Sequence, residues 1–126
     1  MYIESNKVKN IIDEFKRSVP YIEGILVVSA EGLTIYSSLK YTDEEHIAAI
    51  TATLVSLGIN TTRSLNKGDL NSVFVKGADG YILLGEIKQS IVIAVVTRED
   101  VKIGVLLWEL KKVKQKLIET FNLESY

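Results

Sequence analysis

The chain of 126 residues has no cysteine, one proline, one histidine and no long apolar run. Without cysteine it forms neither disulfides nor thiolate metal sites, which suits a reducing compartment, and we expect a cytoplasmic protein. No stretch approaches the roughly 20 consecutive apolar residues that cross a bilayer, so we expect no membrane insertion. The formal net charge of −1 offers no basic field to a phosphate backbone, so we expect no nucleic-acid partner.

The residues that are present have the proportions of a folded domain. Hydrophobic residues make up 47% of the chain and charged residues 25%, which is ordinary globular composition. A chain of this length fits a single domain and can bury a real hydrophobic core. We therefore expect one domain over residues 1–126.

The middle of the chain lacks charge. Between Glu45 and Arg63 there is no Asp, Glu, Lys or Arg. Thr42 followed three residues later by Glu45 has the spacing of a capping box, and acidic residues in a first turn suit the helix dipole. The pattern predicts a helix over residues 42–65 that has unusually few charges for a surface helix.

This helix carries two stripes of apolar or small residues at helical spacing, displaced by about a third of a turn. We expect one stripe to cover the chain's own sheet and the other to meet another molecule. The arc that remains is small or uncharged and includes Thr53, Ser56 and Asn60. The first stripe contains Ile47, Ile50, Thr51, Leu54, Leu57, Gly58 and Thr61, and the second contains Ala48, Ala52, Val55, Ile59 and Thr62.

Periodicity and turn signals predict the other elements. Apolar residues at helical spacing predict helices over residues 8–18 and 101–121, with Asp100 as the N-cap of the second. Alternating or β-branched runs separated by glycine-containing or short turns predict strands over residues 24–29, 33–38, 69–77, 81–87 and 90–97. The order helix, two strands, helix, three strands, helix predicts a three-layer α/β (α+β) domain around a five-stranded antiparallel sheet.

The strand predicted over residues 69–77 should lie at an edge of the sheet. It contains Val73, Phe74 and Val75, and an unpaired apolar edge is an aggregation hazard. Pairing with a second copy across a two-fold axis would remove that edge. An ordinary edge guarded by the charges of Lys67, Asp69 and Lys76 is the alternative. We favour pairing, because the neighbouring helix independently calls for a partner.

The residues that could carry chemistry are few. A lone histidine such as His46, without a second ligand, is more often a surface or capping residue than a metal ligand. Arg63 is the first charge after the uncharged stretch and is a possible arginine finger, although a helix C-terminus is also where a structural arginine belongs. We therefore expect no catalytic, cofactor-binding or metal-binding residues, and no enzymatic activity.

Three segments together resemble the roadblock / dynein light chain family. They are VPYIEGILVVSAEGLTIYSS at residues 19–38, GDLNSVFVKGADGYILLGEI at residues 68–87 and IGVLLWELKKVKQKL at residues 103–117. The capped helix of small residues that begins at Thr42 lies between the first two. The compact form is similar to the prokaryotic and archaeal branch of the family, which includes regulators of Ras-like polarity GTPases.

The resemblance implies a fold with the central helix on one face of the sheet and the N- and C-terminal helices on the other. It implies a homodimer in which the third strands pair and the central helices pack together, acting as a non-catalytic scaffold or regulator of a small Ras-like GTPase. The small polar arc and the arginine after it, Thr53, Ser56, Asn60 and Arg63, are the positions we expect to remain exposed for GTPase contact. The implied dimer contacts are Ile47, Ala48, Thr51, Ala52, Val55, Ile59 and Thr62 on the helix, and Leu70, Ser72, Phe74 and Lys76 on the strand.

A small-molecule sensor is the alternative function, because sheet-and-helix domains of this size can hold a ligand between their layers. The layers here should be filled by leucine, isoleucine and valine, and no polar groups converge to orient a ligand. The sequence therefore favours the interaction protein over the sensor.

Overall fold

The structure, a computed structural model, describes residues 5–40 and 43–121. The helices and strands in these residues follow the predicted order. They are α1 (Ser5–Ser18), β1 (Ile22–Ser29), β2 (Thr34–Ser37), α2 (Glu44–Ser64), β3 (Ser72–Gly77), β4 (Gly80–Ile87), β5 (Ile91–Arg98) and α3 (Ile103–Thr120).

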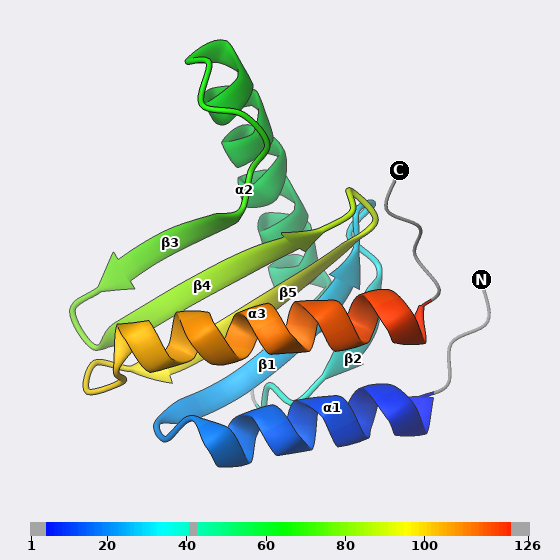
Figure 1. The fold of residues 1–126 in the computed structure, drawn as a ribbon, viewed down its shortest axis with the longest axis vertical. Helices are drawn as coiled ribbons and strands as arrows, with labels where there is room; N and C mark the ends of the chain where they lie inside the picture. Colours follow the sequence, from blue (N-terminus) through cyan, green and yellow to red (C-terminus); the bar gives the residue numbers. More distant parts are fainter. Residues whose placement is uncertain (1–4, 41–42, 122–126) are drawn as a thin grey trace.

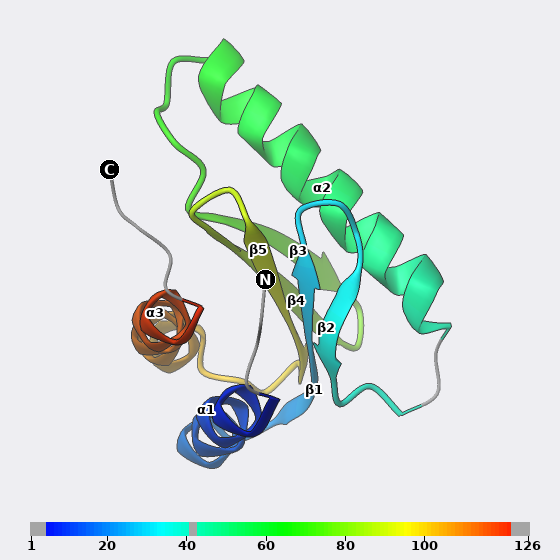
Figure 2. The ribbon, with the colours of Figure 1, turned by 90° about the vertical axis from the view of Figure 1, so that its right-hand side faces the viewer.

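The strands form one antiparallel sheet in the order β2-β1-β5-β4-β3. Figures 1 and 2 show α2 on one face of this sheet and α1 and α3 side by side on the other. The predicted three-layer α/β fold is confirmed. β1 and β5 lie inside the sheet and are buried along most of their length, as expected of strands that are apolar on both faces.

The two layers between the sheet and its helices are unequal. The layer under α1 and α3 contains 17 buried hydrophobic residues, whereas the layer under α2 contains eight. Only Ala48 and Val55 of α2 belong to the smaller cluster. The last turns of α2 extend beyond the strands in both views (Figures 1 and 2). Much of the surface of α2 is therefore left uncovered by the chain's own sheet.

α2 begins two residues later than predicted. Its N-cap is Asp43, whose Oδ1 accepts a hydrogen bond from the backbone N–H of His46 at 3.3 Å. Thr42, the predicted capping residue, lies outside the described residues. Glu44 and Glu45 occupy the first turn, where their charge suits the helix dipole.

The prediction that Asp100 caps the last helix is wrong. α3 begins at Ile103, and its N-cap is Lys102, which makes no side-chain capping bond. Asp100 instead pairs with Arg98, with 3.5 Å between Oδ2 and Nη2, in the turn that leaves β5. Among the described residues, no helix is long and apolar enough to cross a membrane.

The third strand is shorter at its start than predicted, beginning at Ser72 rather than at residue 69. Leu70 does not continue the strand, because its side chain is buried under α2 beside Gly58. A Cβ added to Gly58 would lie 2.9 Å from Val73 and 3.1 Å from Leu70. Glycine at this position lets the helix backbone approach the start of β3 closely.

Candidate functional site

α2 turns toward the sheet a side that draws on both of its stripes. Ala48 and Val55 of the second stripe are buried, and so is Thr51 of the first. Ala52 lies beside the β1–β2 turn, where a Cβ added to Gly32 would be 3.7 Å from the Cβ of Ala52. The expectation that one whole stripe covers the sheet and the other faces outward is therefore wrong in part, because Thr51 and Gly58 of the first stripe also pack inward.

None of the seven helix positions implied for the dimer is exposed. Ala48, Thr51 and Val55 are fully buried in the protomer, so their side chains are not available to a second molecule in this conformation. These positions are covered because α2 packs its small-residue side onto the sheet and contacts all five strands. The other four positions, Ile47, Ala52, Ile59 and Thr62, are half-buried.

The exposed apolar residues of α2 belong to the first stripe. Leu57 is 57% exposed and Ile50 is 41% exposed. Sequence reasoning placed both on a stripe but did not include them among the dimer contacts. The spacing of Ile50 and Leu57 was the available signal, yet it could not tell which of two uncharged stripes faces outward.

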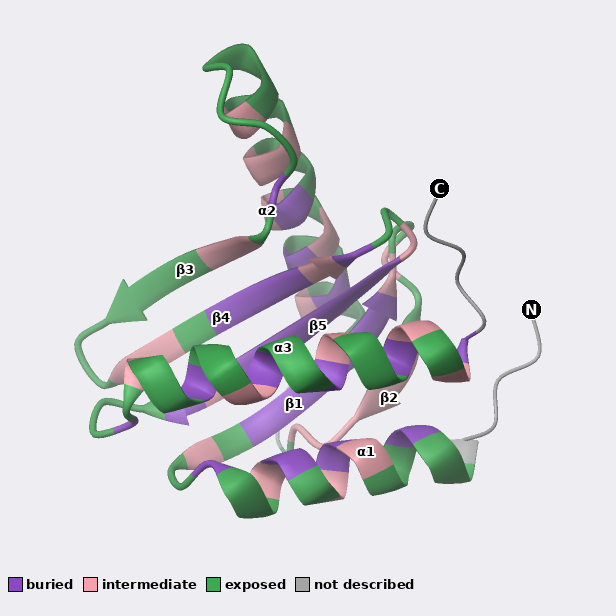
Figure 3. Cartoon of the chain, viewed as in Figure 1, coloured by how far each residue is buried: buried purple, intermediate pink, exposed green. Residues whose placement is uncertain are grey.

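β3 lies at the edge of the sheet, as predicted, and pairs only with β4 in the part of the chain that the structure describes. Phe74, Val75 and Lys76 are exposed and Ser72 is half-buried (Figure 3). Phe74 stacks on Tyr81 of β4 with 5.2 Å between ring centroids. Leu70, the remaining strand position implied for the dimer, is buried in the protomer. The free edge therefore runs from Ser72 to the hairpin turn.

An apolar groove opens between the first half of α2 and the sheet, and its lining extends from the segment after β2 to β3. Its volume is about 230 Å³, and Val75 and Ile82 on its sheet side are exposed. The layer under α2 is thus not filled in the way that the sequence predicts. Exposed apolar surface of this kind marks an interaction site. The groove is lined mainly by Ile47, Ile50, Thr51, Leu54, Leu26, Leu39, Val75, Ile82, Leu84, Ala94 and Val96.

The polar arc of α2 forms the outer ridge of the molecule. Thr53, Ser56 and Asn60 are all exposed, and the Thr53 hydroxyl donates to the carbonyl of Ala49 at 2.8 Å. Arg63 follows on the last turn and takes part in none of the ion pairs between described residues. These four predicted contact positions therefore lie on or near one accessible surface.

Arg63 also lines a polar cleft between the end of α2, the β4–β5 turn and α3. The cleft has a volume of about 510 Å³ and carries charges of both signs. It includes Asp69 and Glu86 as well as Lys88 and Lys114. Sequence reasoning missed this cleft, because its charged groups come from elements far apart in the chain.

Lys114 ties α3 to the segment before β3. Its ammonium donates to the carbonyl oxygen of Asn71 at 2.8 Å, and its stem packs against the backbone of Gly85. Burial lowers the pKa of Lys114 from its usual 10.5, and the nearby carboxylate of Glu86 opposes that shift. The charged form of Lys114 therefore costs the folded state some of its stability.

We expect the stability difference between the native chain and a Lys114→Met variant to depend on pH. Between the lowered pKa and 10.5 the unfolded chain binds more protons than the folded one, so native stability rises with pH in this window. Methionine at residue 114 does not titrate, so the stability of the variant lacks this contribution. Urea unfolding at neutral pH and near pH 10 measures the difference, with Lys111→Met on the exposed side of α3 as the control. A difference that is flat or falls with pH would contradict the lowered pKa.

No group of three His, Cys, Asp or Glu residues in the described part of the chain could hold a metal ion. The backbone of His46 serves the cap of α2. The surface instead combines an exposed apolar stripe, a free strand edge and a groove, which are features of a protein–protein contact.

Comparison with known proteins identifies the same architecture elsewhere. The family model described as Roadblock/LC7 domain matches residues 7–97 of the chain. MglB from Myxococcus xanthus is similar with a TM-score of 0.87 and 18% identity, covering 94% of this chain and 98% of that one. A Roadblock/LC7 domain from Streptomyces avermitilis has a TM-score of 0.80 and 18% identity, covering 98% of this chain and 100% of that one. The gliding protein MglB from Thermus thermophilus has a TM-score of 0.82 and 12% identity, covering 95% of this chain and 93% of that one.

The identities of these solved structures are low, so their likeness to this chain concerns the fold. No curated protein matches the chain by sequence.

Proposed function

Because the chain belongs to the Roadblock/LC7 family, we propose that it acts as a homodimeric, non-catalytic scaffold or regulator of a small Ras-like GTPase. The observation that carries the proposal is the continuous surface formed by the exposed stripe of α2, the groove beside it and the free edge of β3. In this proposal the protein acts in the cytoplasm. It has two protein partners, a second copy of itself and the GTPase.

The dimer joins two β3 edges, so that the two sheets become one. The edge from Ser72 to Gly77 presents unpaired backbone N–H and C=O groups, and pairing with a second copy satisfies them. Antiparallel pairing around a two-fold axis repeats the same contacts on both sides. Ser72, Phe74 and Lys76 remain the strand positions that we assign to this contact.

α2 contributes its exposed stripe to the same contact. The groove is lined by Ile50 and Leu54 on the helix and by Val75 on β3, so the outward stripe and the strand edge lie on one side of the protomer. A second copy seated here removes Ile50 and Leu57 from water, and the burial of apolar side chains favours association. We therefore assign the helix side of the dimer contact to the exposed Ile50 and Leu57, in place of the buried and half-buried positions.

In this proposal the GTPase binds to the outer ridge of α2. Thr53, Ser56 and Asn60 offer short hydrogen-bonding side chains that lose little conformational entropy on binding. Arg63 adds a charge at the end of the ridge. In this proposal the ridge binds the GTPase and changes its conformation.

The direct test uses the small Ras-like GTPases of the source genome, expressed singly and loaded with GDP or a non-hydrolysable GTP analogue. Isothermal titration should show one of them binding with an affinity that differs by about tenfold or more between the nucleotide states. Absence of binding by every such GTPase in both states would overturn the GTPase part of the proposal while leaving the dimer intact.

We expect Arg63→Ala to weaken GTPase binding by about three- to tenfold, the loss of one exposed charged contact. GTP hydrolysis at saturating concentrations of the variant should change by less than about tenfold, because an arginine finger would contribute about a thousandfold or more. Single-turnover hydrolysis measures the effect. Arg98→Ala, at another exposed arginine that lies over the ring of Tyr21, is the matched control. A thousandfold loss in Arg63→Ala would assign a catalytic role to that arginine.

A further inference from the structure

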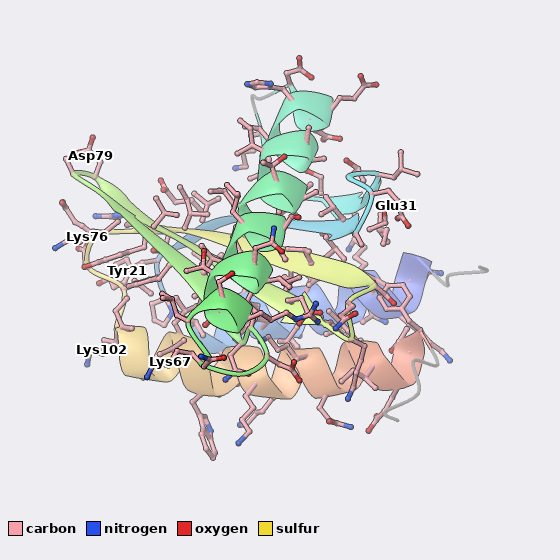
Figure 4. All side chains as sticks on the ribbon, turned by 90° about the horizontal axis from the view of Figure 1, so that it is seen from above. Tyr21, Glu31, Lys67, Lys76, Asp79 and Lys102 are labelled. Atoms are coloured by element: carbon pink, nitrogen blue, oxygen red, sulfur yellow. The ribbon has the colours of Figure 1, made fainter. Side chains whose placement is uncertain are left out.

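The outer surface of α3 carries apolar side chains that the fold leaves uncovered. Trp108 is 62% exposed and Leu107 is 44% exposed, and Val105 one turn earlier is also exposed. Tyr21, which follows α1, lies at the same end of the molecule as Lys102 (Figure 4). Scattered single apolar residues on a surface are ordinary, but a cluster of large ones marks a contact.

Basic residues surround these apolar side chains. Lys111 and Lys112 follow on the next turn of α3. The Lys112 ammonium lies 5.9 Å from the centre of the Trp108 ring and 3.4 Å from the carboxylate of Glu109, the one acidic residue in this half of α3. α1 and α3 each carry a net charge of +2, whereas the whole chain has −1, which leaves −5 for the remaining residues. The layer of α1 and α3 is therefore the positive pole of the molecule, on the sheet face opposite α2 (Figure 2).

We propose that this surface adsorbs reversibly to an anionic lipid bilayer. An interfacial helix places tryptophan and leucine among the headgroups and acyl chains and keeps its lysines at the phosphates. An apolar hollow of about 220 Å³ adjoins Val105 and extends the apolar surface toward Tyr21. We call this surface the α3 patch, and it comprises Tyr21, Lys102, Val105, Leu107, Trp108, Lys111 and Lys112.

The composition of the α3 patch favours a membrane over an acidic protein. Protein–protein interfaces are depleted in lysine, because each contact fixes a flexible side chain in one geometry. A fluid layer of anionic headgroups attracts each nearby lysine without fixing its side chain in one conformation. Tryptophan and tyrosine beside lysine are the side chains that membrane–water boundaries select.

The adsorption does not depend on the proposed GTPase role, and it leaves the exposed stripe of α2 free. If two copies join through β3 around an axis perpendicular to the sheet, both α3 patches face the same way. A dimer then engages one membrane through two patches at once.

Trp108 is the only tryptophan in the chain, so its fluorescence reports on the α3 patch alone. We expect vesicles of mixed phosphatidylcholine and phosphatidylglycerol to shift its emission to shorter wavelength at low salt. Vesicles of phosphatidylcholine alone should leave it unchanged, and added salt should reverse the shift, because the attraction is between exposed charges.

The variant Lys111→Glu/Lys112→Glu should bind the mixed vesicles at least about tenfold more weakly, since each lysine contributes roughly fivefold. The variant Lys40→Glu/Lys67→Glu makes the same change in net charge at either end of α2 and should bind as the native chain does. Leu107→Ser should also weaken binding, whereas Leu33→Ser at the β1–β2 turn should not. All four variants retain Trp108, and circular dichroism confirms that each is folded.

Three results would overturn the proposal. The first is an emission spectrum that mixed vesicles do not change at low salt. The second is equal loss of binding in the two double variants, which would reduce the effect to net charge. The third is an equal shift with soluble polyglutamate, which would identify the α3 patch as a site for acidic protein segments.

Discussion

We expect Leu57→Glu to convert the proposed homodimer into a monomer at micromolar concentration. In the protomer Leu57 is exposed, so glutamate is tolerated and the free energy of unfolding should change by no more than about 0.5 kcal/mol. In the proposed dimer the same carboxylate is buried without a partner, which costs roughly 3 kcal/mol or more. The dissociation constant of the dimer should therefore rise by about a hundredfold or more. Sedimentation equilibrium against the 14.1 kDa mass of one chain measures the change.

Leu33→Glu is the matched control for this variant. Leu33 is a leucine that is still more exposed, at 70%, on the β1–β2 turn and outside the proposed contact. Its dimer should keep the native dissociation constant. If Leu57→Glu remains as dimeric as Leu33→Glu, the exposed stripe of α2 is not part of the interface.

The second large effect is expected from Gly80→Ala. A Cβ at residue 80 would lie 2.0 Å from the carbonyl oxygen of Thr97, a backbone atom of the neighbouring strand β5 that cannot rotate away. The β3–β4 hairpin must therefore shift away from β5. We expect a loss of about 2–4 kcal/mol in the free energy of unfolding, measured by urea denaturation.

Gly77→Ala is the control in the same hairpin. A Cβ at residue 77 meets nothing nearer than the Gly80 carbonyl oxygen at 3.7 Å, which is an ordinary contact. Alanine there should change stability by less than about 1 kcal/mol, because the added methyl group is accommodated. Comparable losses at both positions would mean that the hairpin does not depend on the close approach of Gly80 to β5. Since β3 is held in the sheet through β4, Gly80→Ala should weaken the dimer as well.

Much of the fold could be predicted because local signals agree with the global arrangement. The apolar face of the last helix, with Leu106, Leu110 and Leu117, is buried as its spacing predicts. Ala78 and Asp79 form the turn between β3 and β4, where the sequence predicts a turn between the strands over residues 69–77 and 81–87. The caps were less predictable, because any of several polar residues can serve, and Asp100 found Arg98 as a partner instead.

The orientation of α2 is what the sequence could not decide. Both stripes of this helix are apolar or small, and neither is marked by charge, so the hydrophobic pattern fits either orientation equally well. The choice is made by tertiary packing: Gly58 admits Val73 and Leu70 on one side, and Ala52 admits the β1–β2 turn on the other. The polar cleft around Arg63 and Lys114 was unpredictable for a similar reason, since the Lys114 bond to Asn71 spans 43 residues.

The pairing of two β3 edges is tested most directly by single cysteines introduced into a chain that has none. In an antiparallel pair around a two-fold axis, a single position of each strand faces its own copy, and opposite Cα atoms are then close enough for a disulfide. Cysteines placed one at a time from Ser72 to Gly77 should give an oxidised dimer at one position and little at its neighbours. No crosslink at any of these positions, or equal crosslinking at all of them and at Leu33→Cys, would contradict the homodimer through β3.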